Sequence, residues 1–193
     1  YPTSVSSADV NISNASNTTS KFGWALNAAD FNGDGRADMA VGAYGYSSTT
    51  GRTYIFYNDG AYPSNGSGAD VMITGEGSST AFGRALASGD MNADGKIDLV
   101  VSAEDYGATD GKAYIFYSQN GVLNTNRNIA GEAGSGLGSA LVAGDFNADG
   151  RVDLVVGAHT YSSHNGRTYI FYNDGSIPTT ATTADVIISG EAS

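Results

Sequence analysis

Short apolar runs, separated by polar and glycine-rich segments, recur along the whole chain. The runs are five to eight residues long, are rich in Val, Ile, Tyr and Phe, and are bounded by Gly, Asn and Asp, which predicts strands rather than helices. In the recurring Tyr-Ile-Phe-Tyr segment, alternation places Tyr54 and Phe56 on one face of a strand and Ile55 and Tyr57 on the other. Both faces are apolar, so each sheet is expected to pack against a neighbour on both sides.

The runs belong to a repeated unit. Three segments with the pattern Asp-x-Asn-x-Asp-Gly-x-x-Asp start 60 and then 55 residues apart, at 30–38, 90–98 and 145–153. Each follows a Phe-Gly or Leu-Gly pair and precedes an apolar run, a Gly-Arg/Lys-x-Tyr-Ile-Phe-Tyr segment and a last short run. Each unit therefore supplies four strand-like segments, which is typical of a β-propeller blade.

The predicted fold is all-β, with three four-stranded antiparallel blades and one extra N-terminal strand, thirteen strands in total. Residues 1–12 align without gaps on residues 62–73, so the chain is expected to begin inside a repeat. Residues 1–193 form a single propeller segment, divided into a leading outer strand, 1–17, and three repeats, 18–77, 78–133 and 134–193.

Three blades are too few for a ring, since propellers have roughly four to eight. Two interpretations remain open: a piece cut from a larger protein, or chains that associate into a ring. The start at Tyr1, without an initiator methionine, favours a processed or excised piece. Association through the blades into a homo-oligomer is expected in either case.

Charge and composition limit the kinds of partner that the chain is expected to bind. The net charge of -11 disfavours nucleic acid and anionic membranes and attracts cations. The absence of cysteine excludes disulfides and thiolate metal sites. No apolar stretch of about 18 residues occurs, so no membrane span is predicted. Four N-glycosylation sequons start at Asn11, Asn14, Asn17 and Asn65, although chance matches are common in such a Ser/Thr/Asn-rich chain.

The three acidic loops have the residue pattern of a metal-binding site. Oxygen side chains stand at positions 1, 3, 5 and 9, a glycine at position 6 permits a sharp turn, and the carbonyl of position 7 is a further candidate ligand. One such loop is also an ordinary turn pattern, but three complete copies predict three structural Ca2+ ions per chain. Position 12 is valine rather than the glutamate of an EF-hand, so each loop joins two strands. The predicted ligands are Asp30, Asn32, Asp34, Arg36, Asp38, Asp90, Asn92, Asp94, Lys96, Asp98, Asp145, Asn147, Asp149, Arg151 and Asp153.

With its Phe-Gly pairs, acidic loops and following Gly-Ala pairs, the chain resembles the FG-GAP repeats of integrin α-subunit propellers. Leu137-Gly138 and Ser102-Ala103 depart from the literal motif but keep its pattern. The resemblance implies calcium loops on one face of a propeller and partner binding on the opposite face. It therefore implies an extracellular or cell-surface module.

On that opposite face the resemblance places the loops after the second strand of each repeat. Their aromatic, acidic and histidine residues could contact a protein or a sugar, although such loops are more often simply solvated. Trp24 is a further candidate, with internal packing as the favoured interpretation. The candidate ligand-binding residues are Trp24, Tyr44, Tyr46, Glu104, Asp105, Tyr106, His159, Tyr161 and His164.

Three functions remain open: a calcium-binding adhesion or protein-interaction module, a carbohydrate-binding lectin, and an accessory domain of a secreted hydrolase. No Gly-x-Ser-x-Gly, His-Glu-x-x-His or phosphate-binding Gly-Lys-Ser/Thr motif accompanies the two histidines. The chain itself is therefore predicted not to be an enzyme.

Overall fold

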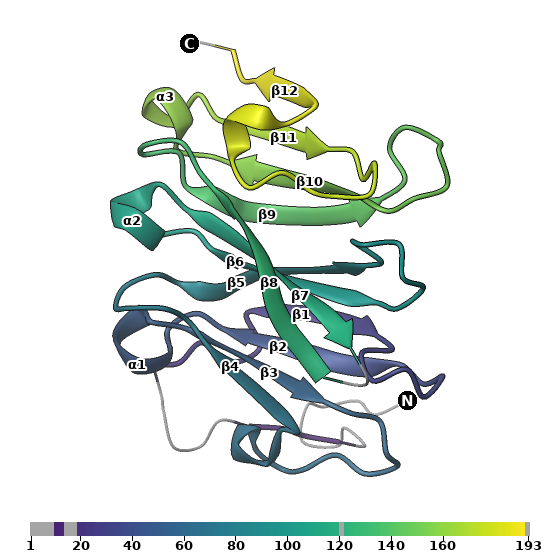
Figure 1. Ribbon diagram of the computed structural model, residues 1–193. Helices are drawn as coiled ribbons and strands as arrows, with labels where there is room; N and C mark the ends of the chain where they lie inside the picture. Colours follow the sequence, from purple (N-terminus) through teal and green to yellow (C-terminus); the bar gives the residue numbers. More distant parts are fainter. Residues whose placement is uncertain (1–9, 14–18, 120–121, 192–193) are drawn as a thin grey trace, which may run out of the picture.

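The computed structural model describes residues 10–13, 19–119 and 122–191. These residues form three four-stranded sheets, each a simple antiparallel meander of consecutive strands. We call the sheet of β1–β4 blade 1, that of β5–β8 blade 2 and that of β9–β12 blade 3. Figure 1 shows the three blades stacked face to face in chain order. The predicted all-β fold built from propeller blades is confirmed, and no ring closes among the described residues.

The strands are short, as the apolar runs predict. Blade 1 contains β1 (Ala25–Ala29), β2 (Asp38–Ala43), β3 (Arg52–Phe56) and β4 (Val71–Thr74). Blade 2 contains β5 (Phe82–Gly89), β6 (Asp98–Ala103), β7 (Lys112–Gln119) and β8 (Val122–Ala130). Blade 3 contains β9 (Leu137–Gly144), β10 (Asp153–Ala158), β11 (Arg167–Phe171) and β12 (Val186–Ser189). The long β7–β8 hairpin distinguishes blade 2 from the other two.

The helical turns were not foreseen from the sequence. One-turn segments follow the second strand of each blade: α1 (Tyr46–Thr49), α2 (Tyr106–Thr109) and α3 (Tyr161–His164). Single 3-10 turns, η2 (Gly66–Gly68) and η3 (Ala181–Thr183), precede the outer strands of blades 1 and 3. Segments of three or four residues are too short for apolar periodicity to reveal them.

The core lies between the blades. Ala40 and Ile55 of blade 1 pack with Leu99 and Val101 of blade 2. On the other side of blade 2, Val100 and Ile115 pack with Leu154 and Val156 of blade 3. Strand alternation explains this arrangement, because successive residues of one strand face the two neighbouring blades.

The predicted alternation in the Tyr-Ile-Phe-Tyr strand is confirmed in blade 1. Tyr54 and Phe56 join the cluster on the outer face of blade 1, whereas Ile55 and Tyr57 pack toward blade 2. Parallel bridges between Gly51 and Phe82, and between Gly111 and Leu137, join consecutive blades.

The expected leading strand, 1–17, lies largely outside the described residues. Of its described part, Ser13 forms a parallel bridge with Asn65, and Val10 to Ile12 are not in a strand. The twelve named strands account for the three blades. In the part of the chain that the structure describes, no helix has the length and apolar character needed to cross a membrane.

Candidate functional site

The acidic loops join the first two strands of each blade, at the opposite strand ends from α1, α2 and α3. Their position-6 glycines adopt positive φ angles of 84° for Gly35, 82° for Gly95 and 85° for Gly150. Glycine populates this region without the steric strain that a Cβ would cause. The predicted sharp turn is therefore confirmed in all three loops.

The first aspartate organises each loop through its backbone. In blade 1, Asp30 Oδ1 accepts a 3.0 Å hydrogen bond from Asp34 N, and Asp30 Oδ2 accepts one of 2.8 Å from Gly35 N. Asp90 and Asp145 accept the equivalent bonds in the other two loops. The three loops thus share one backbone conformation, and these N–H groups offset part of the carboxylate charge.

The last aspartate of each loop is buried and ties the loop to the third strand. Asp98 Oδ2 accepts a 2.8 Å bond from Met91 N, and Asp98 Oδ1 accepts one of 2.9 Å from Ser118 N. Asp38 and Asp153 make the corresponding contacts in their blades. Burial raises the pKa of Asp98 to about 6, with a smaller contribution from Asp94 and Asp90, while its two backbone hydrogen bonds act in the opposite direction.

The third and fifth positions face each other at the loop surface. Asn32 Nδ2 donates to Asp34 Oδ2 over 3.3 Å, with matching bonds of 3.3 Å from Asn92 to Asp94 and 3.1 Å from Asn147 to Asp149. Each loop therefore offers oxygen donors of the kind that Ca2+ prefers, and this donor chemistry fits that ion. Among the described residues, however, no three Asp, Glu or His side chains are grouped to hold a metal ion. Calcium binding would require these side chains to turn toward one point.

Two of the residues at position 7 of the loops also contact the end of the third strand. Arg36 and Arg151 reach back to the carbonyl oxygens of Asn58 and Asn173, at 3.1 and 3.3 Å. Their backbone N–H groups, and that of Lys96, donate to the position-5 aspartate of each loop. These side chains therefore brace the end of the third strand, a contact that the sequence pattern did not indicate.

At the opposite strand ends, side chains from all three blades form a continuous row. The rings of Trp24 and Tyr44 meet edge to face at 4.9 Å, and the Arg84 guanidinium lies 5.2 Å from the centre of the Tyr44 ring. Arg84 Nε pairs with Glu104 Oε2. The other Glu104 oxygen lies 2.9 Å from His159 Nδ1. We call these residues, together with His164, whose ring centre is 6.3 Å from that of His159, the cross-blade row.

Glu104 is the buried centre of the cross-blade row. Its side chain is almost fully buried, and burial raises its pKa. The neighbouring Asp105 acts in the same direction, whereas the positive charge of Arg84 and the proximity of His159 act against it. Arg84 and Glu104 both belong to blade 2, so it is the contact between Glu104 and His159 that joins blade 2 to blade 3 here.

Three of the predicted ligand residues make a contact within their own blade that repeats in all three blades. Tyr46, Tyr106 and Tyr161 each lie under a cation of their own blade, with Arg52, Lys112 and Arg167 at 3.8, 3.7 and 3.6 Å from the ring centres. Cation–π stacks repeated in every blade indicate a structural role for the tyrosines. Asp105 is exposed beside the row.

The favoured packing interpretation of Trp24 is wrong. Its side chain is 55% exposed and contacts Tyr44 at the edge of blade 1. Trp24 follows the Phe-Gly pair at the start of the first strand, where blade 1 has no preceding blade among the described residues. Arg84 holds the equivalent place in blade 2 and was missed as a candidate, because only the fold brings it beside Tyr44 and Glu104.

The repeated blades, the Phe-Gly turns and the acidic loops define a class of protein, the propeller repeat with one acidic loop in each blade. Comparison with known families agrees with this assignment. An FG-GAP repeat model matches residues 22–56, and an FG-GAP-like repeat model matches residues 90–156. The chain belongs to the FG-GAP repeat family of integrin α-type propellers.

Two kinds of curated protein are similar to it. Phosphatidylinositol-glycan-specific phospholipase D of Mus musculus is 38% identical over 155 residues, covering 70% of this chain and 18% of that protein. Integrin alpha-IIb of Mus musculus is 34% identical over 155 residues, covering 72% of this chain and 15% of that protein. The chain spans less than a fifth of the length of either relative.

Proposed function

We propose that this chain is an extracellular, calcium-stabilised interaction module of the adhesion type, with calcium in a structural role. In this proposal the acidic loops brace one face of the blades, and the cross-blade row on the opposite face binds a protein partner. The observation that carries it is the row itself, in which Trp24, Tyr44, Arg84, Glu104 and His159 make successive contacts across three blades.

The chemistry of the row supports a protein partner. The exposed Trp24 and the half-buried Tyr44 lie beside a partly exposed guanidinium and an exposed imidazole, and aromatic and arginine side chains are among those that dominate binding energy at protein interfaces. The contacts with buried Glu104 hold both basic groups in place, so less conformational entropy is lost on binding.

Screening against a displayed library of extracellular domains, in buffer with calcium, tests partner binding. Trp24→Ala and His159→Ala are expected to weaken binding of a selected domain at least about tenfold. Lys96→Ala, on an acidic loop of the opposite face, is the control and should leave binding unchanged. Equal binding by all three variants would reject the cross-blade row as the site.

The calcium role is tested separately by titration calorimetry with calcium chloride. Three sites per chain are expected, with dissociation constants of about 0.1–1 mM, the range of extracellular calcium modules. Such sites are filled outside cells, which supports the proposed extracellular placement. Removal of calcium by a chelator should lower the unfolding temperature, whereas an unchanged unfolding temperature and no measurable heat would reject structural calcium.

A second candidate function follows from the relatives, because an accessory domain of a secreted hydrolase would explain the similarity to a phospholipase D. In that case the chain alone should show no hydrolysis of a glycosylphosphatidylinositol substrate. Hydrolysis that is lost in His159→Ala or His164→Ala would instead make this domain catalytic. A glycan array tests the lectin alternative, to which the exposed Trp24 ring, packed against Tyr44, could contribute.

A further inference from the structure

The two boundaries between consecutive blades, which we call joints, are not equally closed. In each joint, the glutamate that follows the outer strand of one blade accepts a hydrogen bond from a tyrosine of the next blade. The bond from Tyr169 Oη to Glu132 is 2.6 Å long, whereas that from Tyr114 Oη to Glu76 is 3.3 Å long. The Glu76 side chain is 66% exposed and that of Glu132 only 24%. The joint between blades 1 and 2 is therefore the more open one.

A cavity lies at the outer rim of the more open joint. It has a volume of about 120 Å³, and its lining includes Ile73, Glu76, Phe82 and Tyr114. Ile73 is half-buried, whereas Ile129, at the same position of blade 2, is fully buried in the other joint. Both blades of this joint are within the described chain, so the opening does not depend on where the chain begins or ends.

The joint between blades 2 and 3 is closed by a segment of blade 3. This segment, residues 172–185, joins the third strand to the fourth, and we call such a segment an outer connection. Its residues Ile177 and Ala181 are fully buried in the same apolar cluster as Ile129 and Tyr169. The outer connection of blade 3 therefore fills the rim of its joint.

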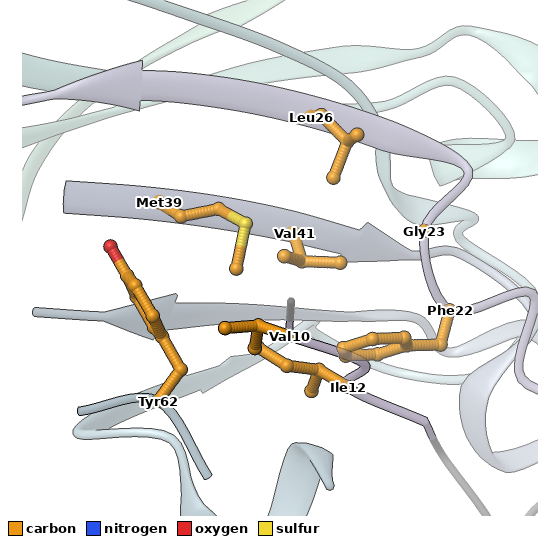
Figure 2. A pocket seen from close by; sticks show the side chains of 8 residues that line it. All are labelled: Val10, Ile12, Phe22, Gly23, Leu26, Met39, Val41 and Tyr62. Carbon is orange, nitrogen blue, oxygen red and sulfur yellow. The ribbon is translucent and has the colours of Figure 1, made fainter. Parts of the chain in front are cut away.

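Blade 1 has an outer connection of the same kind, residues 57–70. Gly66 holds the place of the buried alanine of blade 3, and a Cβ there would meet the Phe22 ring at 3.2 Å and the Tyr54 ring at 3.4 Å. Tyr62 of this connection lines an apolar cavity together with Phe22 (Figure 2). A small residue of the outer connection thus covers the Phe-Gly phenylalanine and the strand tyrosine of its own blade.

Blade 2 lacks this cover. Only residues 120–121 separate β7 from β8, so the position of the glycine or alanine has no equivalent. Leu123 of β8 contributes to the core of the joint. Phe82 and Tyr114, which correspond to the two rings covered in blade 1, line the cavity instead. The cavity therefore lies where the other two blades place a small residue.

The backbone beside the cavity is open as well. Gly75 N donates to Gly51 O over 3.1 Å, so strand alternation directs the N–H of Thr74 away from β3. The corresponding N–H of Ala130 in blade 2 donates to Thr179 O of the outer connection over 2.9 Å. No described residue accepts a hydrogen bond from Thr74 N. The edge of β4 thus offers a free donor next to an apolar cavity.

We propose that this place binds an extended peptide segment of a partner protein, which adds to β4 in parallel. The bridge between Ala130 and Thr180 shows the same parallel addition within the chain. A carbonyl oxygen of the segment accepts the hydrogen bond of Thr74 N, and a glycine or alanine of the segment lies over Phe82 and Tyr114. The proposal does not rest on the calcium loops or on the cross-blade row.

Charge specifies one further residue of the segment. In a parallel register that places the counterpart of Thr180 opposite Thr74, the residue two positions later lies beside Glu76. The exposed carboxylate of Glu76 favours lysine or arginine at this position. The net charge of -11 also attracts a basic segment. The expected partner segment is therefore extended, with a small residue followed directly by a basic one.

The first test is a titration of the 15N-labelled full chain with a synthetic peptide, followed by NMR. The peptide has the sequence of residues 176–184 with Thr182→Lys, so that it carries the closing segment of blade 3 and the basic residue. Saturable shifts of the Thr74, Gly75 and Phe82 amides are expected, with a Kd of about 1 mM. A peptide that also carries Ala181→Asp should bind at least about tenfold more weakly, because it places a charge in the apolar cavity. Absence of saturable shifts at these amides up to about 10 mM, or equal binding of both peptides, would overturn the proposal.

Two substitutions of one residue test the backbone contact. Thr74→Pro removes the outward N–H and should weaken peptide binding at least about fivefold. Thr74→Ala is the matched control, because it also loses the hydroxyl that accepts from Arg52 Nε but keeps the N–H. Equal binding by the two variants would overturn strand addition at β4.

A second pair of variants tests the cavity without changing the backbone. Ile73→Phe fills the cavity and should abolish binding, whereas Met72→Phe, on the opposite and exposed face of β4, should leave binding unchanged. Circular dichroism confirms that all variants are folded. Unchanged binding by Ile73→Phe would reject the cavity as the site.

Glu76→Gln tests the charge contact. The peptide with Thr182→Lys should bind the unchanged protein at least about threefold more tightly than the peptide without it. This gain should disappear in Glu76→Gln, in which the amide oxygen still accepts from Tyr114. An equal gain in both proteins would overturn the proposed register.

Discussion

The carboxylate of Glu132 accepts a 2.6 Å hydrogen bond from the phenol of Tyr169, which lies in the next blade. Arg167 Nη1 donates to the same oxygen, Glu132 Oε1, over 2.8 Å. This three-residue contact joins blades 2 and 3 at the rim of an apolar core, and Glu76 with Tyr114 joins blades 1 and 2 in the same way. The blades are therefore held together by specific polar contacts as well as by apolar packing.

Removing one phenol from a joint should destabilise the protein. Tyr169→Phe loses a hydrogen bond to a charged group, which is worth about 1.5–3 kcal/mol of unfolding free energy. Tyr54→Phe is the control, because Tyr54 holds the same place in blade 1 without a carboxylate partner among the described residues, and its loss should be under about 0.5 kcal/mol. Urea unfolding measures both. Equal losses would show that the joint bond contributes nothing specific.

Alkaline pH should weaken the fold through the joint tyrosines. Burial, followed by the nearby Glu76 and Glu132 carboxylates, raises the pKa of Tyr114 and Tyr169 above the usual 10.0. Above about pH 10 the unfolded chain therefore binds fewer protons than the folded chain, so stability falls as pH rises, by up to about 1.4 kcal/mol per pH unit for each tyrosine.

Urea midpoints from about pH 8 to about pH 11 check this expectation, with tyrosinate absorbance as a second readout. The double variant Tyr114→Phe/Tyr169→Phe should show a shallower decline across the same range. An identical slope in the wild type and the double variant would contradict the assignment of alkaline sensitivity to these two residues.

The fifth and the ninth positions of an acidic loop should respond differently to substitution. Asp98→Ala leaves the N–H groups of Met91 and Ser118 without their acceptor, which should cost about 2–4 kcal/mol of unfolding free energy. Asp94→Ala, at the exposed surface of the same loop, should cost under about 1 kcal/mol in a calcium-free buffer. In calorimetry, Asp94→Ala should remove one of the proposed calcium sites, whereas an unchanged number of sites would exclude Asp94 as a ligand.

Loss of the buried carboxylate in the cross-blade row should loosen the blades. Glu104→Ala leaves Arg84 and His159 without their shared partner and should lower stability by about 2–4 kcal/mol. Trp24 is the only tryptophan and lies at one end of the row, so its fluorescence reports the change. Increased acrylamide quenching of Trp24 is expected in the variant, and unchanged quenching would argue against coupling along the row.

Much of the fold was accessible to sequence reasoning because it is local and repeated. Glycine at position 6 of each loop, the alternation of Tyr54 with Ile55, and four apolar runs per repeat are short-range patterns with direct backbone consequences. The Gly-Glu pairs at 75–76, 131–132 and 190–191 also recur, and this signal could have identified the joints. The sequence analysis did not single these pairs out, because a lone carboxylate in a loop can be solvated by water and no neighbouring residue in the sequence indicates that it has a partner in another blade.

The sequence by itself determined the blade, its strands and the acidic loops, since hydrophobic period and turn chemistry act over a few residues. Only the tertiary structure decided how blades meet. It joined Arg84 of β5 to Glu104 after β6 and to His159 of the next blade, left Trp24 exposed, and placed Tyr46, Tyr106 and Tyr161 under cations of their own blades. These contacts depend on the angle and spacing between sheets, which follow from packing of the whole core and not from any one segment.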